Sequence, residues 1–453
     1  MARPRATVAA TLRLLVMPPS KRIRPEDIPA PVTELCRVLA RHGYRGWVVG
    51  GCLRDLLRGR AAADWDLATD ARPEQVQAIF PRVIPTGIQH GTVTVRQRGV
   101  SYELTTLRGE GAYSDGRRPD SVEFVSDIHD DLGRRDFTIN ALAYDPVTEQ
   151  LEDPYGGLDD LALRLIRAVG APERRFGEDG LRVLRAARFA ASLEFELEPA
   201  TEAAIRPTLD TFRRVSAERV REEWNKALKA REPSRAFRVM RRTGILEVTY
   251  PELARLEEPV WERTLQGLDA VRVEPTLRLA ALLFGLRAEP VNVAEWLVRY
   301  RYSNVEREQV VRLLQCSCPD GSAAWTAADV RRYARRVGRG ALGHVGELSC
   351  VMARAHFGAG SEEAHRAERL RDQLAEGVRP ETPLLTRELA LSGRDLMQQL
   401  SLAPGPRVGK LLEALLDRAL DDPALNTPER LLDAARALSA VEAHPRVREP
   451  NED

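Results

Sequence analysis

The sequence has little cysteine and no long apolar run. Its 453 residues include only five cysteines, at positions 36, 52, 316, 318 and 350, an odd number without the paired spacing of a zinc site. This argues against a disulfide framework and predicts a reducing compartment, hence a cytoplasmic protein. No apolar stretch approaches the length that spans a bilayer, so we expect no membrane partner.

The sequence also lacks an excess of either charge. It has 68 Lys and Arg against 67 Asp and Glu, a net charge of +1. Any nucleic-acid surface must therefore be a local patch, and residues 201–250, where basic side chains outnumber acidic ones, offer one. The same charges also fit an ordinary solvated helix face. The length is too great for one core and indicates about two to four domains.

The stretch from Gly50 to Asp66 carries the clearest local pattern. The apolar run 47–49 predicts a short buried strand, and Gly50-Gly51 ends it with a turn where the backbone can approach a ligand closely. With Arg54 on the following helix, this turn offers N–H groups and a cation to a phosphate.

Two carboxylates close the same stretch. Asp64 and Asp66 are two residues apart, so if residues 64–68 are extended their side chains project from one face. Such a pair suits Mg²⁺, which takes a few carboxylate oxygens and leaves its other positions to water and phosphate. Taken singly, a Gly-Gly turn and an Asp-x-Asp pair are common in solvated loops, and their adjacency favours a functional site.

Further along, charged residues appear at unusual places. A helix is predicted at 73–80 and strands at 84–95, broken by glycines, and at 101–107, where Glu103 stands in a run of β-formers. Read alone, Glu103 is a solvent-facing residue on an alternating strand. In the block 131–145, Arg135 near a helix start would supply a fixed cation for a triphosphate, and Asn140 an amide that both donates and accepts.

From residue 161 the pattern becomes helical and amphipathic. Asp179, Arg182, Arg185 and Arg188 stand three apart on one predicted helix, and the first two share a face. The plain alternative is a salt-bridged surface helix with an acid at its N-terminal end.

Together these motifs resemble the signature of the nucleotidyltransferase superfamily that includes CCA-adding enzymes and bacterial poly(A) polymerases. The matching stretches are G-G-C-L-R-D with D-W-D, Y-E-L-T-T, R-R-D-F-T-I-N-A-L and E-D-G-L-R. The resemblance implies two Mg²⁺ ions on Asp64 and Asp66, with Glu103 as third catalytic carboxylate. It implies that Asp179 and Arg182 read the incoming base and that Arg185 and Arg188 reach its phosphates. The other nucleotide-binding residues are then Gly50, Gly51, Arg54, Arg135 and Asn140.

The implied activity is template-independent addition of CCA, from CTP and ATP, to tRNA 3′ ends, with release of diphosphate. Residues 108–123, rich in glycine and charge, match the flexible loop that CC-adding enzymes lack. An A-adding enzyme or a poly(A) polymerase remains open within the family, although the C-terminus lacks a basic extension. A retired RNA-binding protein is the alternative from another class, and it predicts lost carboxylates. Nothing in the sequence indicates an oligomeric state.

One departure from the family stands in the second half. Many relatives append a metal-dependent HD phosphohydrolase domain, but here Arg263 takes the place of a His, and Phe284-Gly285 that of His-Asp. These residues cannot ligate a metal, so we expect a scaffold without phosphodiesterase chemistry.

The predicted class is α+β, with an N-terminal nucleotidyltransferase head that holds a small mixed sheet, followed by an all-α neck, body and tail. The expected boundaries are an extension or mis-called start at 1–24, head 25–160, neck 161–250, body 251–375, tail 376–442 and a disordered end at 443–453.

Overall fold

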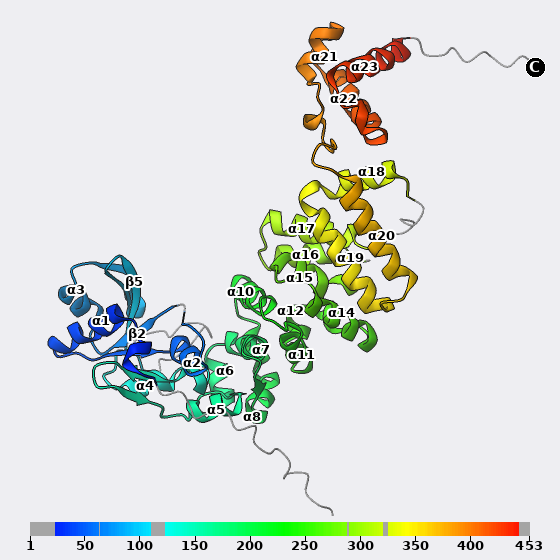
Figure 1. Ribbon diagram of the computed structural model, residues 1–453. Coiled ribbons are helices and arrows are strands. Elements are labelled where there is room, and N and C mark those ends of the chain that lie inside the picture. Colours follow the sequence, from blue (N-terminus) through cyan, green and yellow to red (C-terminus); the bar gives the residue numbers. More distant parts are fainter. Residues whose placement is uncertain (1–22, 63, 110–122, 288–289, 320–324, 444–453) are drawn as a thin grey trace, which may run out of the picture. The chain divides into compact units, whose positions relative to one another are not determined.

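The computed structural model describes residues 23–62, 64–109, 123–287, 290–319 and 325–443. Almost all of the expected N-terminal extension, of the loop at 108–123 and of the C-terminal end lies outside these ranges. The chain divides into two compact units, Met1–Ala254 and Arg255–Asp453. The expected class is confirmed, because a mixed sheet near the N-terminus is followed by helices (Figure 1).

A seven-stranded sheet forms the centre of the first unit. Its strand order is β3-β4-β5-β2-β1-β6-β7, and only the pair β2–β5 is parallel. The strands are β1 (Gly46–Val49), β2 (Asp66–Thr69), β3 (Val83–Gly87), β4 (Thr92–Gln97), β5 (Val100–Thr106), β6 (Ala143–Asp145) and β7 (Gln150–Glu152). The run expected at 84–95 is thus two strands, joined through the 3-10 turn η3 (Ile88–His90). A parallel pair, β8 (Leu165–Ile166) and β9 (Glu196–Leu197), forms a separate small sheet.

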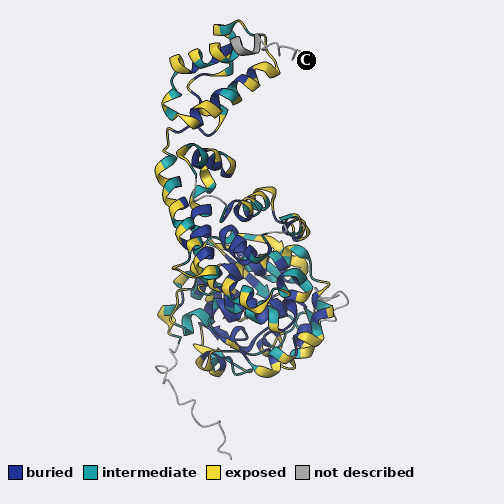
Figure 2. Ribbon diagram, turned by 90° about the vertical axis from the view of Figure 1, so that its right-hand side faces the viewer, coloured by how far each residue is buried: buried dark blue, intermediate teal, exposed yellow. Residues whose placement is uncertain are grey.

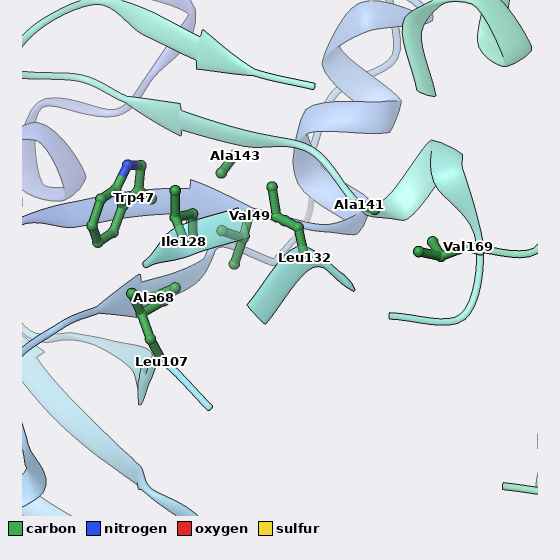
Figure 3. Close-up of a cluster of buried hydrophobic side chains, with 9 residues drawn as sticks. All are labelled: Trp47, Val49, Ala68, Leu107, Ile128, Leu132, Ala141, Ala143 and Val169. Carbon is green, nitrogen blue, oxygen red and sulfur yellow. The ribbon is translucent and has the colours of Figure 1, made fainter. Parts of the chain in front are cut away.

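Short helices cover this sheet. They are α1 (Ala30–Arg41), α2 (Gly51–Leu57), α3 (Pro73–Ile79), α4 (Ile128–Gly133) and α5 (Gly157–Leu163), with 3-10 turns η2 (Pro25–Asp27) and η4 (Thr138–Asn140). Figure 3 shows the buried cluster where strands and α4 meet, with Trp47 beside Ile128. Its members are Trp47, Val49, Ala68, Leu107, Ile128, Leu132, Ala141, Ala143 and Val169. Removing a side chain as large as Trp47 from such a core costs about 3–5 kcal/mol.

Residue 135 lies after a helix, not at the start of one. The side chain of Asp127 accepts a hydrogen bond from the backbone N–H of His129 at 2.9 Å and so caps the N-terminus of α4, which begins at Ile128. Helix α4 ends at Gly133, two residues before Arg135. The next helix after Arg135 is the 3-10 turn η4, which begins at Thr138, so the expected position near a helix start holds only for that short turn.

Apart from the pair β8–β9, the described elements of the first unit that follow α5 are helices. Helix α7 packs against both α10 and α11. The helices are α6 (Pro172–Glu178), α7 (Leu181–Ser192), α8 (Pro199–Ala203), α9 (Leu209–Phe212), α10 (Ala217–Leu228), α11 (Ser234–Arg242), α12 (Ile245–Thr249) and α13 (Pro251–Ala254), with η5 (Arg206–Thr208).

The described residues of the second unit contain helices and no strand. The helices are α14 (Glu258–Ala270), α15 (Pro275–Leu282), α16 (Pro290–Arg299), α17 (Asn304–Cys316), α18 (Ala327–Val337), α19 (Leu342–Phe357), α20 (Glu362–Gly377), α21 (Gly393–Leu400), α22 (Pro406–Asp421) and α23 (Pro428–Ala443). The 3-10 turns are η6 (Phe284–Leu286), η8 (Arg339–Ala341), η9 (Thr386–Glu388) and η10 (Pro423–Leu425). Many helices bury one side and expose the other (Figure 2). Among the described helices, none combines the length and the apolar character needed to cross a membrane.

Candidate nucleotide and metal site

Two carboxylate residues lie side by side on neighbouring strands of the sheet. Asp66 is the first residue of β2 and is paired in register with Glu103 of β5. Because the strands are parallel, registered residues point to the same face of the sheet. Asp64 lies two residues before Asp66, outside the strand, and all three residues are exposed. The strand that carries Glu103 is therefore the neighbour of the strand that carries Asp66, as a shared role of the two carboxylates requires.

The electrostatics of Asp66 suit a cation. The residue is exposed, yet its carboxylate is partly desolvated, and this raises the pKa of Asp66 above its ordinary value. Arg135 lowers that pKa, while the charge of Asp64 raises it further. Within the described ranges, no three His, Cys, Asp or Glu side chains are grouped closely enough to hold a metal ion by themselves. A site here therefore needs oxygen ligands from the substrate, as is usual for Mg²⁺.

The glycine turn lies against these residues. Gly50 adopts φ 79° and ψ −135°, a conformation that favours glycine. A Cβ atom at this position would lie 3.0 Å from Nη1 of Arg135 and 4.0 Å from Oδ2 of Asp66. The next residue, Gly51, begins α2, and a Cβ there would lie 3.3 Å from Nη2 of Arg54. Both glycines keep side-chain bulk away from the cations that flank the turn.

The amide of Asn140 connects two parts of the site. Its Oδ1 accepts from Nη1 of Arg54 at 2.7 Å, and its Nδ2 donates to Oδ1 of Asp136 at 3.0 Å. Arg54 also donates from Nε and Nη2 to both oxygens of Asp55, each at 3.0 Å. Asn140 is 7 % exposed, so its amide holds protein groups in position at both ends.

Arg135 keeps part of its guanidinium uncommitted. Its Nη2 donates to Oδ2 of Asp131 at 3.1 Å, and its Nη1 donates to the backbone oxygen of Asn140 at 3.4 Å. Its Nε is buried without a hydrogen-bond partner in the described part of the chain. Burial opposes ionisation of Asp131, but Arg134 and Arg135 outweigh it and lower the pKa of Asp131 below its ordinary value.

The E-D-G-L-R segment bends between two helices. Asp179 is the residue that ends α6, and α7 begins only at Leu181, so the expected single helix from residue 179 to 188 is wrong. Gly180 makes this junction possible. A Cβ atom there would lie 2.6 Å from both the backbone N and the Cα of Phe212 in α9, closer than real side chains come.

Asp179 and Arg182 are both held by protein groups. Oδ2 of Asp179 accepts from Nη2 of Arg219 at 2.8 Å, and its Oδ1 accepts from the backbone N–H of Leu181 at 3.0 Å. Arg182 donates from Nη1 to Oε2 of Glu178 at 2.7 Å and from Nη2 to the backbone oxygen of Arg134 at 2.8 Å. The carboxylate of Asp179 thus already accepts hydrogen bonds from protein N–H groups, and the guanidinium of Arg182 already donates to protein oxygens.

Arg185 and Arg188 of α7 form ion pairs with buried carboxylates. Arg185 donates from Nε and Nη2 to Oδ2 of Asp136, at 2.8 and 2.6 Å. Arg188 donates from Nε to Oε2 of Glu223 at 2.5 Å, and Nη1 of Arg185 lies 4.0 Å from Oε1 of the same residue. Lys226 is a third cation beside Glu223, with its Nζ 3.0 Å from Oε1 of that residue.

Sequence reasoning missed Glu223. This residue of α10 is 2 % exposed, and burial opposes its charge, yet the three cations lower its pKa below the ordinary value. A signal was present, because Val220, Trp224 and Ala227 form an apolar helix stripe that Glu223 interrupts.

Comparison with known proteins places these residues in a family. The chain matches the description "Poly A polymerase head domain" over residues 46–167, "Probable RNA and SrmB-binding site of polymerase A" over 194–257 and "tRNA nucleotidyltransferase domain 2 putative" over 274–435. A CCA-adding enzyme of Geobacillus stearothermophilus is 35% identical over 398 residues, 87% of this chain and 93% of that protein. The chain belongs to the CCA-adding enzyme family. It is therefore a nucleotidyltransferase.

Other members of this family agree in length and fold. A CCA-adding enzyme of Lactiplantibacillus plantarum is 34% identical over 407 residues, 89% of this chain and 94% of that protein. The crystal structure of the Bacillus stearothermophilus CCA-adding enzyme in complex with CTP is 31% identical, with a TM-score of 0.73 over 92% of this chain and 99% of that one. The Thermotoga maritima CCA-adding enzyme complexed with tRNA shares the fold, with a TM-score of 0.63 at 20% identity, over 92% and 97% of the two chains.

The positions compared with an HD domain carry no metal-ligand set. Arg263 lies on α14, and Phe284 and Gly285 lie in η6. Phe284 is fully buried, with Arg287 over its ring at 4.4 Å and the ring of His356 at 5.3 Å. Burial lowers the pKa of His356 to about 4, assisted by Arg287 and Arg263.

Proposed function

We propose that this CCA-adding family member completes tRNA 3′ ends by adding two CMP residues and one AMP, from CTP and ATP, with release of diphosphate at each step. The observation that carries the proposal is the pairing of Asp66 with Glu103 beside the Gly50–Gly51 turn. This arrangement offers carboxylates to a cation and backbone N–H groups to a triphosphate within one site. The named relatives support tRNA as the acceptor.

We propose that Asp64 and Asp66 hold two Mg²⁺ ions, with Glu103 as the third carboxylate of the site. The chemistry of the donor set fits, because mutual repulsion of the two aspartates is relieved by a hard divalent cation. Bound Mg²⁺ would lower the pKa of the RNA 3′-hydroxyl and offset charge on the departing diphosphate. No side-chain general base is required in this scheme.

The chain's own cations would bind and orient the triphosphate. Arg135 places Nη1 beside the Gly50 turn, and its side chain is 20% exposed, so its guanidinium can offer positive charge to a phosphate bound at that turn. Arg54 stands beside the Gly50–Gly51 turn. Arg185 and Arg188 supply further positive charge from α7, although Asp136 and Glu223 offset part of it. These groups together would keep the α-phosphate in line with the attacking hydroxyl.

Base choice would fall to Asp179 and Arg182. A carboxylate only accepts hydrogen bonds and a guanidinium only donates them, a pair that meets the edge of cytosine or, after a small reorientation, of adenine. A base can take the bond that Arg219 now makes to Asp179, because both are partly exposed, with side-chain exposures of 24% and 18%. Nucleotide binding would thus exchange one hydrogen bond for another.

We also propose domain boundaries, a cellular location and an RNA-contacting surface. We assign the head to residues 25–160, the neck to 161–250, the body to 251–375 and the tail to 376–442, and we expect a cytoplasmic enzyme. The basic stretch 201–250 would contact the tRNA backbone.

The deciding experiment supplies CTP and ATP, singly and together, to tRNAs that end before CCA, after C and after CC. Completion of all three to CCA supports the proposal. Addition of a single A to the CC end alone would indicate an A-adding enzyme, and long A tails a poly(A) polymerase. No incorporation on any tRNA would favour a retired RNA-binding protein.

A further inference from the structure

One aromatic ring lies at the centre of the cations of the site. Phe189 of α7 is 4 % exposed, and three guanidinium carbons lie over its ring. Their distances to the ring centroid are 3.7 Å for Arg188, 5.3 Å for Arg185 and 5.4 Å for Arg54. All three fall within the range of about 6 Å in which an aromatic face attracts a cation.

The cations come from two separate segments. Arg54 belongs to α2, beside the glycine turn, whereas Arg185 and Arg188 belong to α7. Phe137, in the R-R-D-F-T stretch, meets the same ring edge-to-face, with 5.7 Å between centroids and 88° between planes. The ring of Phe189 therefore joins the three segments that carry the proposed phosphate-binding groups.

An aromatic ring can hold several guanidinium groups close together without cancelling their positive charge, which a carboxylate cannot do. Three guanidinium groups close together repel one another, and Asp136 and Glu223 offset part of this repulsion. A further carboxylate would also cancel the positive charge that a triphosphate needs. The π face of a phenyl ring attracts the guanidinium groups through its quadrupole and adds no formal charge.

We propose that Phe189 is a positioning residue that holds Arg54, Arg185 and Arg188 in the arrangement that binds the triphosphate. The inference rests on the proposed function in one respect, namely that these three arginines bind the nucleotide. A phenylalanine that served only as core packing would tolerate any ring of the same shape. A positioning residue of this kind depends on the electron density of its ring.

A fluorine series separates these two roles. Site-specific replacement of Phe189 by mono-, di- and trifluorophenylalanine nearly preserves shape while it weakens the quadrupole step by step. Phe195 provides the matched control, because it is buried to 3 % exposure and, among the described residues, has the guanidinium of Arg58 over its ring, at 5.0 Å, in place of three cations. The measurements are kcat and KM for CTP on a tRNA that ends before CCA, and for ATP on one that ends in CC.

We expect KM at position 189 to rise with each fluorine, to about tenfold for the trifluoro ring, while kcat stays within about twofold. A raised KM with an unchanged kcat means that the substrate and the transition state have lost the same amount of binding energy. The series at position 195 should leave KM unchanged. Phe189→Leu should raise KM by a similar factor, and a fall in kcat alone would indicate a merely structural role.

Arginine variants keep the outcomes distinct. If Arg185→Gln and Arg188→Gln raise KM about tenfold while the fluorine series is flat, the positioning role of Phe189 is wrong and the proposed phosphate contacts stand. If the arginine variants leave KM unchanged, the proposed phosphate contacts themselves are wrong. Equal KM increases at positions 189 and 195 would also overturn the inference, since the effect would then reflect general packing.

Discussion

Glu103 lies directly opposite Asp66 in the parallel pairing of β5 with β2. This is the one parallel contact in a sheet whose other neighbours are antiparallel. It brings together residues that are 37 positions apart in the sequence, on one face and at the start of β2. The pairing gives the site its carboxylates and leads to the first prediction.

Asp64→Ala and Asp66→Ala should each abolish nucleotide incorporation and leave tRNA binding nearly intact. The lost interaction with Mg²⁺ should raise the barrier by several kcal/mol, roughly a thousandfold in rate. Single-turnover incorporation and filter binding of tRNA test the two halves of this statement. Asp70→Ala is the matched control, because Asp70 lies at the other end of β2 and accepts from the backbone N–H of Arg45 at 2.8 Å. Incorporation by the Asp66 variant within a few-fold of wild type would exclude a metal-binding role.

Asp179→Ala should relax discrimination against UTP and GTP more than it slows the best remaining nucleotide. A site built on charged hydrogen bonds rejects a wrong base because buried groups are left unpaired, at about 1.5–3 kcal/mol per bond. The measurement is kcat/KM for all four nucleotides on tRNAs that end before CCA and in CC. Arg219→Ala is the control, since it removes the present partner of Asp179 and keeps the carboxylate. Ratios unchanged in Asp179→Ala, in a variant that still binds tRNA, would remove Asp179 from base reading.

Stability should fall in acid because of buried carboxylates near the site. Burial opposes the charge of Asp136, but Arg185 and Asn140 hold its pKa well below the ordinary value. A carboxylate with a lowered folded-state pKa adds stability above its unfolded pKa of about 3.9, and loses that contribution as pH falls towards its folded pKa. The denaturant concentration at the midpoint of unfolding should therefore decrease as the pH is lowered below about 4.

The variant Asp136→Asn tests that linkage. It should cost about 3–5 kcal/mol of unfolding free energy at pH 7, and the difference from wild type should shrink below pH 4. Denaturant unfolding at both pH values gives the two differences. Asp210→Asn is the control, because that side chain is 95% exposed and should change neither value. A difference that stays constant with pH would contradict a lowered pKa at Asp136.

The pure protein should not hydrolyse 2′,3′-cyclic nucleotides to nucleoside monophosphates, with or without added Ni²⁺ or Mn²⁺. Arg263, Phe284 and Gly285 occupy the compared positions, and none of them can ligate these metals. Chromatographic separation of the cyclic substrate from nucleoside 2′- and 3′-monophosphates, after incubation with the full chain, tests this. Robust metal-dependent hydrolysis would mean that a ligand set exists elsewhere in the chain.

The sequence allowed much of the head to be predicted. A run of β-forming residues predicts the strand that carries Glu103, the spacing of Asp64 and Asp66 suits an extended segment, and the motif resemblance implies that the three carboxylates work together. The pairing itself required the resemblance, because a parallel contact between strands joined by α3, β3 and β4 cannot be read from local pattern alone.

The errors in the prediction have local causes. Spacing by three residues suggested one helix from Asp179, but the chain turns at Gly180, and a glycine within a charged helical pattern does not reveal which backbone it will contact. Arg135 lies between α4, which Asp127 caps eight residues earlier, and the short turn η4, and the local pattern does not reveal where these two helices begin. Glu223 was missed because a solvated acid and a buried one look alike until the three cations around it are known.

Under the proposed role of Asp179 and Arg182 in reading the base, the contact at Gly180 limits how base choice can change by mutation. A library that varies the two residues between Asp179 and Arg182 should return glycine at position 180, because any side chain would collide with the backbone at Phe212. New nucleotide preferences would then have to arise from substitutions at Asp179, Arg182 or Arg219 themselves, or by movement of the whole α9 segment. The route to altered specificity is therefore narrow, and sequencing the active clones of that library should return glycine alone at position 180, with more varied residues at position 181.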